Sequence, residues 1–312
     1  MRKIVLILTV SLGVAGLPTA AGQEVDIKNL YDAFGTPVHG AQLDWGYSAL
    51  IHFRGQTILF DAGANADIFG RNAKALGVNL KAIDYAVISH RHGDHYSGFD
   101  YVLKVNPALK IYVPEDLAFA GTQGLRIPGA PPEITNALPR DLRYFPGENR
   151  TTTGPWGSRF WNAHLENVPT SKEIAPGAFL IVTKSELWGD FNRVHPQDPP
   201  HLAGLPELSL ALVTSKGTVL VTGCSHSGVE NIVRETKQVI PKNVQLVTGG
   251  FHLLQSTAPE ITQFAHTLKD QLGVRQVAPA HCTGMVAFYI LSQVYGENFI
   301  KAGLASDIKI EP

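Results

Sequence analysis

Short apolar runs separated by turn residues dominate the sequence once its first 46 residues have passed. Two such runs, at residues 47–53 and 56–60, predict strands joined by a tight turn. Residues 66–76 carry apolar positions at helical spacing, and Gly77 then ends the predicted helix. A further apolar strand over residues 83–89 runs directly into a cluster of histidines.

Strands and helices alternate in the last third of the chain. Residues 208–213, 218–222, 244–247 and 274–277 predict four strands, and a final helix begins near Met285. Two amphipathic helices lie between the last three strands. Their stripe positions are Val229, Ile232, Val233, Thr236 and Ile240 in the first helix, and Ile261, Phe264, Ala265, Leu268 and Leu272 in the second. This order predicts an α/β protein in which two sheets pack together with helices outside.

The segment from residue 114 to residue 206 has a different character. Prolines and glycines are frequent in it, and it contains one predicted strand, at residues 179–183. Loops of this length are uncommon unless they serve a site, so we expect a loop-rich insertion over the functional face of a single domain, residues 22–312. Its aromatic and arginine side chains are candidates for lining a pocket or binding an anionic group: Trp156, Arg159, Phe160, Trp161, Trp188, Phe191 and Arg193.

Residues 1–21 have the features of a secretory signal peptide. Arg2 and Lys3 precede a short apolar run, and small residues follow it, with Ala21 as the expected cleavage position. The run is shorter than the roughly 20 apolar residues that cross a bilayer, and its retention as an anchor is the alternative. Cleavage would place the mature protein in the periplasm or outside the cell and change its formal net charge from −1 to −3. Such a charge provides no basic surface for nucleic acid.

The strongest chemical signal is the sequence HRHGDH at residues 90–95, directly after a predicted strand. Alternate residues of an extended segment project to the same side, so His90 and His92 are placed to bind one ion. The glycine permits a sharp turn that directs Asp94 and His95 toward a second position. This spacing predicts two divalent ions, and imidazole and carboxylate ligands suit zinc, iron or manganese.

Further candidate ligands follow the predicted strands of the last third of the chain. His226, His252 and His281 each come shortly after one of these strands. Functional groups gather at the carboxyl ends of strands in α/β sheets, so we expect these histidines to complete the site. Cys224 is either a thiolate ligand or a small buried side chain, whereas Cys282 is expected to be a packing residue. A disulfide between the two cysteines would compete with metal binding.

These motifs resemble those of the metallo-β-lactamase superfamily. The resemblance is carried by Asp61 and the HxHxDH pattern of residues 90–95, and the order of elements over residues 47–281 follows that of the superfamily. Three segments are similar to the branch called 7,8-dihydropterin-6-methyl-4-(β-D-ribofuranosyl)aminobenzene-5′-phosphate synthase: residues 221–228, 249–253 and 279–284. The resemblance implies an αββα sandwich of two mixed sheets with outer helices and a dinuclear site at its edge.

The resemblance also implies roles for individual residues. For the two metal positions it implies these ligands: His90, His92 and His226 for the first, and Asp94, His95 and His281 for the second. Asp61 would orient the ligand loop through hydrogen bonds. The sequence departs from the commoner pattern at Cys224, where many members have a bridging aspartate. It also has no identifiable ligand histidine before the strand pair that ends near Cys224, so His226 is expected to take the place of that histidine.

The expected chemistry is hydrolysis. Two ions that share a water lower its pKa from about 15.7 toward neutrality and so supply hydroxide that attacks a carbonyl or phosphoryl centre. Asp94 and His252 are the candidate catalytic residues. His252 occupies a place like that of the extra histidine in tRNA 3′-processing nucleases, and it would either protonate the leaving group or bind an ion.

The sequence therefore predicts a metal-dependent hydrolase of a small ester, lactone, phosphoester or amide. We expect two divalent ions, with zinc ahead of manganese or iron, and neither a nucleic-acid nor a membrane partner for the mature protein. One alternative is a non-catalytic metal-binding or sensing module on the same fold. Another is a redox enzyme, which His92 disfavours because diiron relatives have a glutamate in its place.

Overall fold

The fold comes from a computed structural model that describes most of the chain. The described residues are 24–116, 119, 125–127, 131–137, 139, 150–152, 163–184 and 205–312. The expected signal peptide and the aromatic and arginine residues proposed to line a pocket in the insertion lie outside them, so those expectations stay predictions. Within the described part of the chain, no helix has the length and apolar character needed to cross a membrane.

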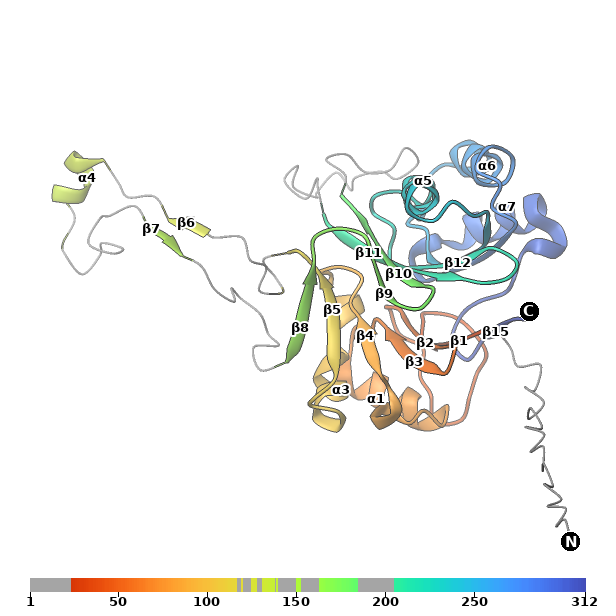
Figure 1. The fold of residues 1–312 in the computed structure, drawn as a ribbon, viewed down its shortest axis with the longest axis horizontal. Coiled ribbons are helices and arrows are strands. Elements are labelled where there is room, and N and C mark those ends of the chain that lie inside the picture. Colours follow the sequence, from red (N-terminus) through yellow and green to blue (C-terminus); the bar gives the residue numbers. More distant parts are fainter. Residues whose placement is uncertain are drawn as a thin grey trace, which may run out of the picture.

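Two mixed β-sheets form the centre of the molecule (Figure 1). The first sheet contains β1 (Val25–Tyr31), β2 (Ser48–Phe53), β3 (Gln56–Phe60), β4 (Tyr85–Val87), β5 (Lys110–Pro114), β8 (His164–Val168) and β15 (Asp307–Ile310). The second contains β9 (Lys172–Ala175), β10 (Ala178–Thr183), β11 (Glu207–Val213), β12 (Thr218–Thr222), β13 (Val244–Gly250) and β14 (Gln276–Ala280). Their spatial orders are β15-β1-β2-β3-β4-β5-β8 and β14-β13-β12-β11-β10-β9.

Helices cover the outer face of each sheet, with the two sheets between them (Figure 1). They are α1 (Ala66–Ala75) and α3 (Phe99–Val105) on the first sheet, and α5 (Val229–Val239), α6 (Ala258–His266) and α7 (Met285–Tyr295) on the second. Alternate strand residues face opposite sides of a sheet, so Ile58 and Phe60 enter the core between the sheets while Leu59 packs under the helices. The predicted αββα sandwich is confirmed.

Parallel pairing gives the sheets a common functional edge. In the second sheet β12, β13 and β14 are parallel neighbours, and in the first sheet β3, β4 and β5 are parallel neighbours. Parallel strands connected through helices end at the same edge of a sheet, and the segments that follow them leave from that edge. The predicted ligand residues follow β4, β12, β13 and β14.

Several elements agree with the local signals in the sequence. β2 and β3 form the expected hairpin, whose turn residues Arg54 and Gly55 have φ values of 49° and 79°. Helix α1 begins where the side chain of Asn65 accepts hydrogen bonds from two backbone amides of the first turn. The final helix starts at Met285, as expected.

Other elements have no clear signal in the sequence. β1 and β15 were not predicted, and neither were the short helix α2 (Gly93–Tyr96) and helix α3. Two further strands, β8 and β9, lie inside the segment for which the pattern predicts one strand. Many residues of β8 and β9 are polar and half exposed, so it is pairing with β5 and β10 that makes them strands. A separate pair, β6 (Leu125–Ile127) with β7 (Arg150–Thr152), also lies within the segment of residues 114–206.

Candidate metal centre

Four segments that follow strands bring their side chains together at one edge of the sandwich. His90 comes after β4, Cys224 and His226 after β12, His252 after β13, and His281 directly after β14. Groups of these side chains, together with residues of the turn that follows His90, have ligand atoms within 4.8 Å of one another. The structure thus gathers all seven predicted ligand residues, and His252, in one place.

Three imidazoles form the first group. The Nδ1 atom of His92 lies 3.1 Å from Nε2 of His90 and 3.0 Å from Nε2 of His226. Burial, together with the neighbouring imidazoles, holds the pKa of His90 and of His226 well below the usual value, and burial lowers that of His92 to about 4. All three rings are therefore neutral near pH 7, which is the form that binds metal.

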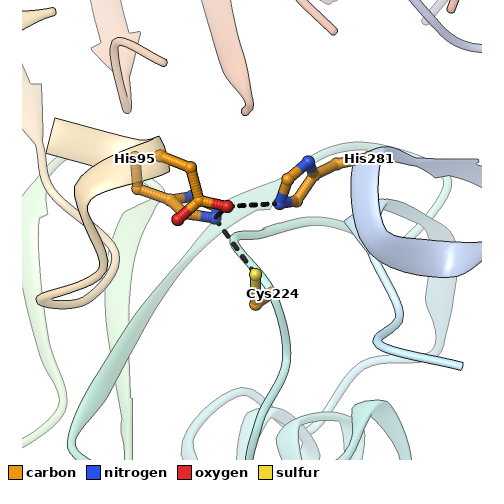
Figure 2. Close-up of side chains that lie close together, drawn as sticks. His95, Cys224 and His281 are labelled. Atoms are coloured by element: carbon orange, nitrogen blue, oxygen red, sulfur yellow. Dashed lines mark hydrogen bonds and ion pairs between the residues drawn. The ribbon is translucent and has the colours of Figure 1, made fainter. Parts of the chain in front are cut away.

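The second group combines a carboxylate, two imidazoles and a thiol (Figure 2). His95 Nε2 lies 3.0 Å from Cys224 Sγ, and Asp94 Oδ2 lies 3.2 Å from His281 Nε2 and 3.8 Å from His95 Nε2. Burial raises the pKa of Cys224 well above that of a free thiol. Burial would lower the pKa of His95, but the carboxylates of Asp94 and Asp61 outweigh it and raise that pKa to about 9.

His252 borders both groups. Together with Cys224 and His226 it forms a third set of side chains whose ligand atoms lie within 4.8 Å, and its ring centroid is 4.3 Å from that of His226. This position allows either of its expected roles, as proton donor or as metal ligand.

Asp61 holds two of the candidate ligand histidines in place, one directly and one through Ser89. Its carboxylate accepts hydrogen bonds from the backbone amide and the hydroxyl of Ser89, both at 2.7 Å, and lies 2.7 Å from Nδ1 of His95. The Ser89 hydroxyl is in turn 2.8 Å from Nδ1 of His90. The predicted orienting contact of Asp61 is therefore present, and Ser89, which the sequence motif did not single out, extends it to a second histidine.

The donor set fits divalent metal ions. Metal-binding histidines usually hold their second ring nitrogen with a carboxylate or a similar group, and here His95 does so with Asp61 and His90 with Ser89. The ring nitrogens that face the other ligands, Nε2 in both residues, point into the two groups. Nitrogen, sulfur and carboxylate oxygen donors in this number suit zinc.

Several residues at the centre have unusual backbone conformations. Asp61, Ser225, His252 and His281 have positive φ values of 56°, 63°, 49° and 45°. Non-glycine residues adopt this left-handed region at a cost, and they remain there when surrounding contacts hold them. The strands thus end in constrained turns that direct these side chains toward one another.

Two residues between β1 and β2 contact the candidate metal centre, although no sequence motif includes them. Asp32 is fully buried, and its carboxylate accepts hydrogen bonds from the backbone amide of His281 at 3.3 Å and from the Asn29 side chain at 2.9 Å. Burial raises the pKa of Asp32 to about 6. The ring of Trp45 packs on His281 with centroids 4.8 Å apart, and the residue is 44% exposed. No sequence signal identifies either residue, because their partner lies about 240 residues away.

Comparison with known proteins agrees with this architecture. Residues 46–251 match the family described as the metallo-β-lactamase superfamily. The 7,8-dihydropterin-6-methyl-4-(β-D-ribofuranosyl)-aminobenzene-5′-phosphate synthase of Methanocaldococcus jannaschii is 27% identical over 271 residues, which cover 81% of this chain and 84% of that protein. A ribonuclease Z of Clostridium novyi is 33% identical over 170 residues, 52% of this chain and 47% of the relative.

A solved structure shows the same fold. The crystal structure of a metal-dependent hydrolase of the β-lactamase superfamily aligns with a TM-score of 0.67 at 23% identity and covers 92% of this chain and 100% of that one. The resemblance inferred from the HxHxDH pattern and the later segments is thereby confirmed, both for the superfamily and for the branch. The chain belongs to the metallo-β-lactamase superfamily.

Proposed function

We propose that the protein is a metal-dependent hydrolase of a small ester, lactone, phosphoester or amide. The observation that carries this proposal is the convergence of two ligand groups, one of three imidazoles and one of carboxylate, imidazoles and thiol, at a single edge of the sandwich. Two adjacent groups of this kind favour two divalent ions, and the mixed nitrogen, sulfur and oxygen donors favour zinc. Such ions would supply Lewis acidity and lower the pKa of a water molecule.

The protein's own residues provide the remaining functions. Burial would raise the pKa of Asp94, but the imidazoles of His95 and His281 hold it below the usual range, so this carboxylate is ionised at any working pH. Burial lowers the pKa of His252, yet its hydrogen bond to Cys282 and the charge of Glu207 raise it above the usual value. A raised pKa suits His252 to the role of proton donor to a leaving group.

The test is a substrate panel with the purified, zinc-loaded protein. It contains chromogenic esters, lactones, amides, a β-lactam and phosphoesters, the last because the name of the Methanocaldococcus relative includes a 5′-phosphate. We expect turnover that a chelator abolishes and zinc restores, and that His92→Ala lowers by at least about 100-fold. His266→Ala is the matched control, since His266 is an exposed histidine on α6, and it should leave turnover unchanged.

Other outcomes would contradict the proposal. Turnover that survives complete metal removal would exclude a metal-dependent reaction. Tight binding of two ions with no turnover on any substrate would instead favour the non-catalytic metal-binding module. A tRNA precursor belongs in the panel because a relative is a ribonuclease Z, and the formal net charge of −1 leads us to expect no cleavage of it.

A further inference from the structure

Glu207 is a buried carboxylate whose charge acts on His252, and it also makes hydrogen bonds to the loop that carries His226. It stands at the start of β11 and is 2% exposed. One oxygen accepts a hydrogen bond from the backbone amide of His226 at 2.9 Å. The other accepts two, from the backbone amide of Ser227 at 2.8 Å and from its hydroxyl at 2.9 Å. All three donors belong to the loop that carries His226.

The next residue makes a corresponding contact with the opposite sheet. The backbone amide of Leu208 donates to the carbonyl oxygen of Ser89 at 2.8 Å. Ser89 directly precedes His90, and its hydroxyl is 2.8 Å from that ring. The side chain of Glu207 therefore holds the His226 loop of the second sheet. The backbone amide of the next residue, Leu208, holds the His90 loop of the first sheet.

The first metal position lies between these two loops. Its imidazoles come from both sheets, and the 3.0 Å approach of His226 Nε2 to His92 Nδ1 depends on how the loops are placed. The His226 loop is not regular structure, and Ser225 within it has a φ of 63°. Without the carboxylate, two backbone amides in the interior would lose their acceptor, and a buried amide left without an acceptor is destabilising. The loop would then be expected to rearrange.

We propose that Glu207 is a positioning residue for the first metal position: it holds the His226 loop against the His90 loop, so that an ion binds between the sheets without reorganisation. The inference rests on the proposed function only in that it takes this cluster to bind metal, and it is independent of any substrate. Among the described residues, Glu207 belongs to none of the groups that could hold an ion. It should therefore act through His226.

Metal binding to Glu207→Gln tests the proposal directly. The amide keeps the size of the side chain but presents N–H groups to at least one of the loop donors. We expect the affinity for one of two ions, measured by competition with a chromophoric chelator and by the cobalt(II) absorption spectrum, to fall by about 10–100-fold, with the other ion unaffected. Wild-type affinity for both ions would overturn the proposal.

Asn72→Ala is the matched control for a structural defect. Asn72 is fully buried in α1, accepts a hydrogen bond from the backbone amide of Gln42, and donates to the carbonyl oxygens of Leu30 and Gln42. It thus holds a loop as Glu207 does, but it contacts no candidate ligand. This variant should lower the unfolding temperature and leave the metal stoichiometry unchanged. If it loses one ion as Glu207→Gln does, the loss reflects general destabilisation and the proposal fails.

A double-mutant cycle with His226→Ala separates positioning from an independent role. If Glu207 acts through His226, Glu207→Gln should produce no further loss of affinity once that imidazole is absent. Losses that add would show a separate action of Glu207 and would contradict the proposal. These measurements use no substrate, so a failure to find hydrolysis would count against the proposed function and leave this inference standing.

Discussion

At the scale of single residues, Cys224 is where this chain departs most from the commoner superfamily pattern. Its sulfur lies 3.0 Å from Nε2 of His95, which is a contact with a candidate ligand of the second position. Both cysteines of the chain are free and buried, and Cys282 Sγ lies 3.6 Å from the backbone oxygen of Cys224. Cys282 therefore packs against Cys224 and contacts His252, and of the two cysteines Cys224 is the one whose sulfur belongs to the candidate ligand groups.

Replacing that sulfur should affect metal binding. We expect Cys224→Ser to lower metal content or activity by more than about tenfold, because an alcohol is a poorer metal ligand than a thiolate. Even the loss of a residue that only hydrogen-bonds to a metal ligand has an effect of this size. Elemental analysis of the purified variant measures the content. Cys282→Ser is the control and should retain both ions. Unchanged metal stoichiometry in Cys224→Ser would rule out sulfur ligation.

The protonation of His95 and Cys224 makes a prediction about pH. Both pKa values are raised in the metal-free protein, that of His95 to about 9, so both groups hold a proton at pH 7. Each proton must leave before the group binds metal, so affinity should rise with pH by about tenfold per unit for each proton released, up to about pH 9.

This pH dependence should differ between the two metal positions. Metal binding at the second position should release two protons in the wild type and one proton in Cys224→Ser. At the first position the imidazoles are already neutral, so the metal affinity should change little above pH 7. Titration of metal binding at several pH values measures the slopes. Equal slopes for wild type and Cys224→Ser would contradict ligation by the sulfur.

At the scale of elements, the turns that follow β4 and β12 pack closely against each other. A Cβ atom on Gly223 would lie 2.2 Å from Oγ and 2.6 Å from Cβ of Ser89, closer than atoms can approach. Ser89 is the residue that links Asp61 to His90. Only glycine lets the two turns meet while this link stays intact.

Gly223→Ala should therefore damage stability and metal binding together. Overpacking of this kind costs about 1–3 kcal/mol, and displacement of Ser89 would turn the ring of His90. Denaturant unfolding and metal analysis measure the two effects. Gly273→Ala is the control, because a Cβ there meets nothing within 4 Å and only its φ of +67° is strained. Normal metal content in Gly223→Ala would show that Ser89 is not needed to place His90.

At the scale of the whole molecule, each of the two candidate ligand groups takes side chains from both sheets. The first has His90 and His92 from the first sheet and His226 from the second, and the second has residues of the 93–96 helix together with Cys224 and His281. A bound ion would thus join the two sheets at their shared edge. Binding to the folded state alone stabilises it by about 2.7 kcal/mol per ion when the free metal is at 100 times Kd.

Metal removal should consequently lower the stability of the whole fold. We expect a chelator to reduce the unfolding temperature by several degrees and added zinc to restore it, as followed by calorimetry or circular dichroism. The His92→Ala variant should show a smaller chelator effect because one position is already weakened. An unfolding temperature that does not respond to chelator or zinc would argue against ions that connect the sheets.

Much of the fold could be predicted because strong local signals agree with it. Short-range patterns predict the hairpin at residues 47–60, the helix capped by Asn65 and the alternation of strands and helices after residue 207. β1 and β15 were missed because they are recognisable mainly through their pairing with each other and with β2. The candidate ligands were found because histidine, aspartate and cysteine at strand ends are informative wherever the strands later lie.

The sequence by itself determined the chemistry available to this protein: the HxHxDH turn, the histidines that follow three later strands, and Cys224 in place of a carboxylate. These are properties of residue type and spacing, which survive without any knowledge of the fold. Only the tertiary structure decided which groups meet, and it added Ser89, Asp32, Trp45 and Glu207 around them. Their contacts join loops from different strands and different sheets. Contacts between segments that are distant in the sequence produce no periodic pattern from which they could be predicted.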